Sequence, residues 1–145
     1  MKHKISIAAA AILAISSSSA FAGQSTGNFN VSMTVNAECR IVSSTDLNFG
    51  TAGVWTSNLD VSSAITVQCT NGTAYNVGLG VGANGSSVSD RRMKAGSGND
   101  TILYQLYRDA GRTQVWGNTT GTDTVSQTGN GSNQAITVYG RVPTQ

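Results

Sequence analysis

The stretch AITVQCTNGTAYNVGLGV, residues 64–81, decides the fold class of this chain. Both of its halves place apolar residues at every second position, which is typical of strands with one buried face. These residues are Ile65, Val67 and Cys69 in the first half and Tyr75, Val77, Leu79 and Val81 in the second. Asn71 and Gly72 stand between the halves and favour a turn. The stretch therefore predicts two strands joined by a turn.

Further short segments of the same kind lie downstream, at residues 101–108 (TILYQLYR) and 134–142 (QAITVYGRV). The first has apolar residues on both sides, which predicts burial on both faces. Ser, Thr, Asn and Gly dominate the rest, and these residues suit strands and turns better than helices. Repeated short strands at this spacing indicate an all-β sandwich. Residues 82–100 are predicted to form a surface loop, and residues 119–133 are polar and rich in turn residues.

Residues 1–22 have the three regions of a secretory signal peptide. A basic start, MKHK, precedes an apolar run, and Ala20-Phe21-Ala22 provides the small residues that signal peptidase recognises. We expect cleavage after Ala22. The apolar run is too short to cross a bilayer comfortably, and no later stretch is longer and equally apolar, so we expect export without membrane insertion.

Cleavage would change the charge balance of the chain. It removes Lys2 and Lys4 from the nine basic residues, which leaves seven against seven acidic ones, and it removes His3, the single histidine. A neutral chain argues against binding of nucleic acid or anionic lipid. Without histidine or a G-x-S-x-G motif, we expect no enzyme, no catalytic residue, no metal site and no cofactor. A secreted hydrolase built on a sandwich is the weakest alternative.

Cys39 and Cys69 are the two cysteines of the chain. An even pair in an exported protein predicts a disulfide. The bond would close a loop of 31 residues, which stabilises the fold by roughly 3–4 kcal/mol in the chain-entropy description. A zinc site requires about four ligands, and a nucleophilic cysteine requires a base such as histidine, so both alternatives are weaker.

Two short motifs carry weaker signals. Residues 80–85, GVGANG, match the dinucleotide-binding pattern G-x-G-x-x-G. That motif needs a helix beginning at the glycines, and no helical pattern follows, so a glycine-rich turn is predicted. Residues 90–94, DRRMK, are predicted to form a solvated loop, with a weak contact to a polyanion as the alternative.

Residues 27–39, GNFNVSMTVNAEC, show a second alternating pattern just after the predicted cleavage site. The apolar positions are Phe29, Val31, Met33 and Val35. The pattern predicts a strand with one apolar face. It leaves two alternatives open: the first strand of a self-contained sandwich, or a strand that enters the core of a neighbouring molecule.

Four stretches, in order, resemble the sequence blocks of spore coat U domains. They cover residues 38–53, 65–87, 91–122 and 136–143. The matching positions are Asn48, Phe49, Gly50, Cys69, Arg92, Met93, Leu103, Tyr104, Leu106, Tyr107, Asp109, Arg112, Trp116 and Gly117. The likeness runs from about residue 28 to residue 143, nearly the whole predicted mature chain.

This resemblance implies a subunit of an archaic chaperone–usher pilus, a secreted fibre used for attachment and biofilm formation. Members of the family have an incomplete immunoglobulin-like sandwich. A periplasmic chaperone fills the gap first, and the N-terminal strand of another pilin subunit replaces it at the outer-membrane usher. The resemblance thus implies a donor-strand extension at residues 23–36, with Phe29, Val31, Met33 and Val35 as the inserted side chains, and export through the periplasm to the cell surface.

The sequence departs from the family pattern near its end. In the family, the block at residues 140–143 is followed by a glycine-bearing turn and a last strand of alternating Thr and Val, whereas this sequence stops at Gln145. We expect either a truncated chain or a domain at residues 37–145 that lacks its last strand, with two adjacent core edges open. The alternative function is a single-domain adhesin, or a spore or cell-surface coat protein, that binds a surface or glycan.

Overall fold

A computed structural model describes residues 23–96 and 98–144. The predicted signal peptide at residues 1–22 lies outside the described residues. Contacts divide the chain after Met33, and the unit that begins at Thr34 contains every strand of the described part. This unit is described below.

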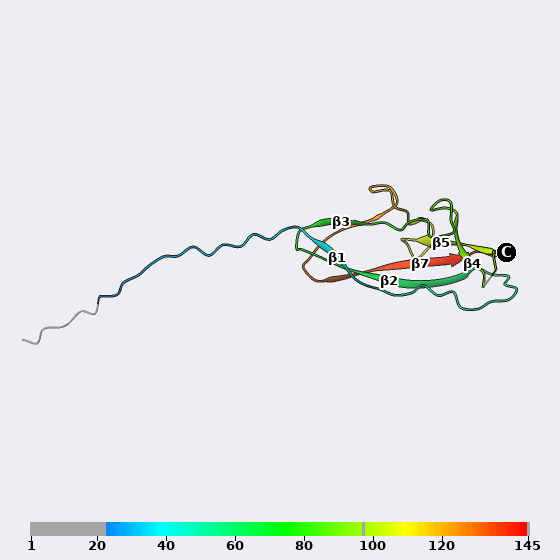
Figure 1. Cartoon of the computed structure of the whole chain (residues 1–145), viewed down its shortest axis with the longest axis horizontal. Helices are drawn as coiled ribbons and strands as arrows, with labels where there is room; N and C mark the ends of the chain where they lie inside the picture. Colours follow the sequence, from blue (N-terminus) through cyan, green and yellow to red (C-terminus); the bar gives the residue numbers. More distant parts are fainter. Residues whose placement is uncertain (1–22, 97, 145) are drawn as a thin grey trace, which may run out of the picture. The chain divides into compact units, whose positions relative to one another are not determined.

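Seven strands make up the described fold, without a helix. They are β1 (Cys39–Ser44), β2 (Leu59–Cys69), β3 (Ala74–Val77), β4 (Arg91–Lys94), β5 (Thr101–Tyr107), β6 (Val125–Thr128) and β7 (Asn133–Val142). One sheet has five strands in the order β1-β2-β7-β5-β4, and the other pairs β3 with β6. Figure 1 shows β2 and β7 side by side, with β3 in the second layer. The prediction of an all-β, immunoglobulin-like sandwich is confirmed.

The antiparallel pair of β2 and β7 forms the centre of the larger sheet. Its register runs from Leu59 opposite Val142 to Gln68 opposite Asn133. Inward positions on β7 are Ile136, Val138, Gly140 and Val142, all buried, whereas the residues between them are exposed or half-buried. The period of two seen in the sequence therefore separates the core face from the outer face in this strand.

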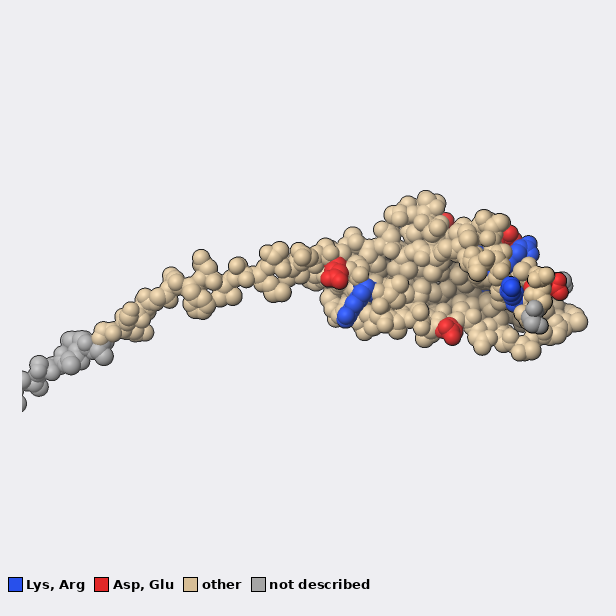
Figure 2. Space-filling model, in the orientation of Figure 1, with Lys and Arg blue, Asp and Glu red and all other residues tan. Residues whose placement is uncertain are grey.

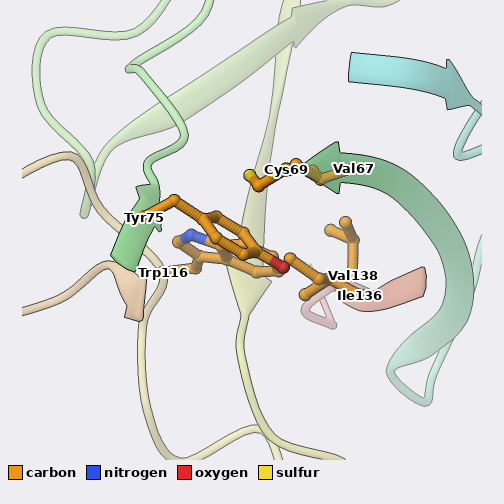
Figure 3. Packing of buried hydrophobic residues seen from close by; sticks show 6 residues of the cluster. All are labelled: Val67, Cys69, Tyr75, Trp116, Ile136 and Val138. Carbon is orange, nitrogen blue, oxygen red and sulfur yellow. The ribbon is translucent and has the colours of Figure 1, made fainter. Parts of the chain in front are cut away.

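The buried core lies between the two sheets, where two aromatic rings cover aliphatic side chains. In Figure 3 the rings of Tyr75 and Trp116 lie beside each other and face Val67, Ile136 and Val138. The polar atoms of both rings have partners: Trp116 Nε1 donates to the carbonyl of Val77 at 2.8 Å, and Tyr75 Oη donates to Gln127 Oε1 at 2.7 Å. Large aromatic area is thus buried without an unpaired polar tip.

The predicted surface loop at residues 82–100 is wrong in part, because it contains β4. The prediction of a solvated loop at residues 90–94 is wrong for Arg91, which is fully buried. Its guanidinium donates to the carbonyls of Gly80 at 2.8 Å, Leu79 at 2.7 Å, Val88 at 3.1 Å and Trp116 at 2.6 Å. Four carbonyls replace water around the cation, which explains how a charged side chain is buried without a carboxylate. Burial lowers the pKa of Arg91 from its usual range.

Three other predictions on local structure have clear outcomes. Strand β6 lies inside the polar stretch at residues 119–133, where only Val125 marked a strand. Strand β5 is half-buried at every position, as expected for a segment with apolar residues on both faces. Residues 80–85 form no helix, and Gly82 has φ +81°, as a glycine turn requires.

Candidate assembly interface

Burial ends abruptly at the outer strand β1. Ile41 lies directly opposite Val67 on the core side of the sheet, yet Val67 is 3% exposed and Ile41 is 70% exposed. Every residue of β1 is exposed. Within the described residues β1 pairs with β2 alone, so its other edge has backbone groups without a strand partner. An apolar side chain and an unpaired strand edge together form a surface suited to another strand.

A hollow of about 690 Å³ opens on the inner face of the larger sheet, at the end away from the disulfide. Its main apolar lining residues are Leu47, Phe49, Trp55, Leu59, Met93, Ile102 and Val142. These side chains come from β2, β4, β5, β7 and the segment between β1 and β2. The two-stranded sheet is too small to cover a five-stranded one completely, so this part of the apolar face is open.

Residues 47–50 form one wall of the hollow and are held close to β7. The amide of Gly50 donates to Asn48 Oδ1 at 2.8 Å, and Gly50 has φ +75°, a conformation that favours glycine. A Cβ at Gly140 would lie 2.7 Å from Leu47 Cδ2 and 2.9 Å from Phe49 Cζ. The missing side chain at Gly140 therefore allows the chain to pack directly on the strand.

The predicted disulfide between Cys39 and Cys69 is present and joins β1 to β2. The two cysteines are register partners in the antiparallel ladder. Cys69 is 2% exposed in the core, whereas Cys39 is exposed on the outer strand. The bond therefore ties the open edge to the buried part of the sheet.

The alternating segment Phe29, Val31, Met33 and Val35 is exposed, with fractions of 84%, 83%, 87% and 63%. The structure assigns no strand between residues 23 and 38. Exposed large apolar side chains in a regular row are unusual, because most such surface residues are scattered singly. The role of these four residues as a donor strand remains a prediction.

Charged groups on the outer face form small paired sets. Asp60 accepts two hydrogen bonds from Arg141, from Nε and Nη2, both at 2.8 Å, and Arg112 Nε lies 3.4 Å from the same carboxylate. The hydrogen bond from Arg141 lowers the pKa of Asp60. The face drawn in Figure 2 carries only scattered charged side chains.

Side chains that could ligate a metal ion do not gather in the described part of the chain. No group of three or more His, Cys, Asp or Glu side chains lies there at a spacing that could hold a metal ion. Among the described residues, no helix is long and apolar enough to cross a membrane. What the arrangement provides is an apolar hollow on the inner face of the larger sheet and, at β1, a strand edge without a strand partner among the described residues.

Comparison with known proteins identifies the family. The profile of the Spore Coat Protein U domain matches residues 25–145. The chain belongs to the spore coat U domain family. Protein U of Myxococcus xanthus is 38% identical over 159 residues, covering 97% of this chain and 88% of that protein.

A solved structure of similar fold is the complex of the chaperone CsuC with the tip adhesion subunit CsuE. It is a pre-assembly complex from the archaic chaperone–usher Csu pili of Acinetobacter baumannii. The TM-score is 0.55 at 26% identity, and the match covers 77% of this chain. It covers 35% of the matched chain, so our protein spans about a third of that length.

Several residues that match the family's sequence blocks have a clear structural role. Trp116 is in the core, and a Cβ at Gly117 would collide with the carboxylate of Asp123. Asp109 accepts hydrogen bonds from the amides of Thr113, at 3.0 Å, and Gln114, at 2.7 Å, which order the loop after β5. The backbone hydrogen bond from Gln114 is the main cause of the lowered pKa of Asp109.

The sequence did not reveal Arg91 or Ile41 as residues of structural interest. Arg91 and Met93 alternate with Arg92 and Lys94, so β4 has a period of two, but an arginine at an alternate position indicates an exposed residue and not a buried one. The exposure of Ile41 depends on which strands are neighbours, and no local signal reports that.

Proposed function

We propose that this chain is a structural subunit of a chaperone–usher pilus that polymerises by donor-strand exchange. The observation that carries the proposal is the presence of two features: an apolar inner face that is open over β2, β7, β5 and β4, and an exposed alternating segment at residues 29–35. Each of the two features is an exposed apolar surface that another strand or groove could cover. Together they have the complementary shapes of a groove and a strand.

The physics of strand addition supports this assignment. Main-chain hydrogen bonds to an open edge supply affinity, and alternate side chains enter the apolar groove. Phe29, Val31, Met33 and Val35 would each contribute about 1.5–3 kcal/mol on burial. The entropy of ordering the segment opposes this gain, so the ladder bonds and the closure of the receiving core are also needed.

The partners follow from the same mechanism. A subunit with an open core requires a periplasmic chaperone before assembly, then an outer-membrane usher and further pilin subunits. The similarity to a chaperone–adhesin pre-assembly complex supports the chaperone and pilin partners. The product is a fibre at the cell surface that supports attachment and biofilm formation, with a structural role rather than a catalytic one.

The test uses the full mature chain, oxidised, in a concentration series followed by size-exclusion chromatography with light scattering. We expect oligomers that grow with concentration. The double variant Val31→Asp with Met33→Asp should remain monomeric, because two charges cannot enter an apolar groove. A synthetic peptide of residues 27–36 should then raise the Tm of this double variant in a saturable manner.

A matched control keeps the added charge and changes the face. The double variant Asn30→Asp with Ser32→Asp places the same two carboxylates on the polar side of the segment and should still form oligomers. Equal behaviour of the two double variants, or a Tm that does not respond to the peptide, would contradict the proposal.

A second candidate is a spore or cell-surface coat protein. The 38% identity to Protein U and the name of the matching domain support it. A coat subunit would associate without the alternating segment, so the double variant Val31→Asp with Met33→Asp would assemble as the unaltered chain does.

A further inference from the structure

We infer that Thr70 is a positioning residue which fixes the chain at residues 36–38, so that the donor segment fills the groove of a second copy of this chain and not its own. The inference rests on the proposed function. It concerns residues 36–38, which connect the segment to β1, because reversal of the chain there decides between polymer and closed monomer.

Thr70 contacts the base of the segment through both its backbone and its side chain. Its amide donates to the carbonyl of Glu38 at 2.9 Å. Its Oγ1 accepts the amide of Glu38 at 3.2 Å and lies 3.1 Å from the carbonyl of Asn36, to which it donates. A single threonine therefore binds polar backbone groups of two residues ahead of β1.

These contacts extend the ladder of β1 and β2 past its last residues. Cys39 and Cys69 are register partners and are joined by the disulfide. The bond from the Thr70 amide to Glu38 adds one further rung, and the side chain reaches back to Asn36. The chain is thus held in line with β1 back to residue 36.

A donor segment that filled its own groove would have to reverse direction close to β1. Reversal at residues 36–38 would break the contacts with Thr70. Reversal before residue 36 would place the turn in Met33-Thr34-Val35, which has no Gly, Pro, Asn or Asp and contains two β-branched residues. It would also remove Met33 and Val35 from the inserted strand, half of its four apolar side chains.

The remaining occupant is another molecule with the same groove, and in a pure sample this is a second copy. The mature chain would carry equal numbers of acidic and basic residues, so copies do not repel one another through net charge. The groove and the segment come from one sequence, so every molecule offers both.

Two single variants of the full mature chain test the inference. Thr70→Val removes the hydroxyl at nearly constant shape, and Ala37→Gly places a glycine after Asn36, the sequence that favours a two-residue hairpin turn. We expect each variant to contain several times more closed monomer than the unaltered chain. This monomer fraction should not change with protein concentration, and its Tm should not rise when the peptide of residues 27–36 is added. Thr70→Ser, which keeps the oxygen, and Thr73→Val, on the same turn, should assemble as the unaltered chain does.

The outcomes separate this inference from the proposed function. If Thr70→Val only lowers the Tm and Ala37→Gly has no effect on assembly, Thr70 has a purely structural role and the inference is wrong. If Thr70→Val does not fold, Ala37→Gly decides alone. If the unaltered chain forms no oligomers and the double variant Val31→Asp with Met33→Asp does not respond to the peptide, the proposed function itself is wrong.

Discussion

The two outer strands of the larger sheet, β1 and β4, end it in opposite ways. Strand β4 is four residues long and carries Arg92 and Lys94, and its first residue, Arg91, is buried with four carbonyl partners. Strand β1 is exposed along its whole length and presents Ile41. Short, charged edges resist pairing with other chains, whereas an edge strand with exposed apolar side chains, such as Ile41 and Val42 of β1, invites it.

The difference separates the stable part of the fold from its interactive part. Arg91 connects β4 to Leu79, Gly80, Val88 and Trp116, so this edge is fixed to the segments that follow β3 and β5. At the other edge, the disulfide and the ladder with β2 hold β1, and its inner face has no cover from the second layer. One outer strand is thus anchored by a buried arginine, whereas the other leaves the inward side chain of Ile41 exposed to a partner.

The largest expected effect comes from breaking the anchored edge. Arg91→Met removes the buried cation and leaves four carbonyls without their donor, among them that of the buried Trp116, and should lower the free energy of unfolding by roughly 3–5 kcal/mol. Urea unfolding measures this change. Arg92→Met on the same strand is the control, with an expected change below about 1 kcal/mol because Arg92 is paired with Asp90 at the surface. Similar losses in both variants would disprove the special role of Arg91.

Releasing the open edge should have the next largest effect. Reduction of the bond between Cys39 and Cys69 should lower the free energy of unfolding by roughly 3 kcal/mol. Amide hydrogen exchange should accelerate in β1 before it does so in β4. Thermal unfolding and exchange with and without reductant provide the measurement. Uniform acceleration over both strands would show that the disulfide stabilises the whole fold and not this edge.

Charging the open edge should separate stability from assembly. Ile41→Lys should change the free energy of unfolding by less than about 0.5 kcal/mol, because Ile41 is 70% exposed. Affinity for the peptide of residues 27–36 should fall about tenfold, equivalent to about 1.4 kcal/mol. Isothermal titration of the peptide into the full-length double variant Val31→Asp with Met33→Asp, with and without Ile41→Lys, measures this affinity. Ser43→Lys, on the outer side of β1, should leave the affinity unchanged, and an equal loss there would count against the groove.

The smallest effect concerns the centre of the sheet, between the two edges. Hydrogen bonding to Arg141 lowers the pKa of Asp60, so the stabilisation is present at neutral pH and is lost as the pH falls below about 4. Asp60 is about one third exposed (34%), so the contribution should be below about 1 kcal/mol. Urea midpoints at pH 7 and pH 3 should differ less in Asp60→Asn than in the unaltered chain. An unchanged difference would rule out this pair as a source of acid sensitivity.

The sequence predicted the strands whose inward residues are aliphatic. β2, β3 and β7 follow from Ile65, Val67, Tyr75, Ile136 and Val138, because alternation of apolar and polar residues reports a half-buried strand directly. The disulfide followed from the number of cysteines in an exported chain. These features depend on local pattern or composition.

The features that the sequence did not predict depend on non-local arrangement. β4 was missed because its inward residue, Arg91, is charged and is compensated by carbonyls from three other segments. An open core was expected from the family resemblance alone; residue patterns do not place the exposed Ile41, because its exposure depends on β1 being the outermost strand. Alternation identifies a strand but not its neighbours.

The bulge in β1 has a consequence for the crowded conditions of export. The register with β2 shifts between Ile41 and Ser43, so that Val42 interrupts the ladder. A bulge increases local twist and breaks the even spacing of free amide and carbonyl groups. Two β1 edges from different molecules therefore match over only a few residues, which disfavours the flat, repeated stacking of amyloid. Strand β1 can thus remain open to a donor strand while the risk that β1 edges of different molecules aggregate is reduced.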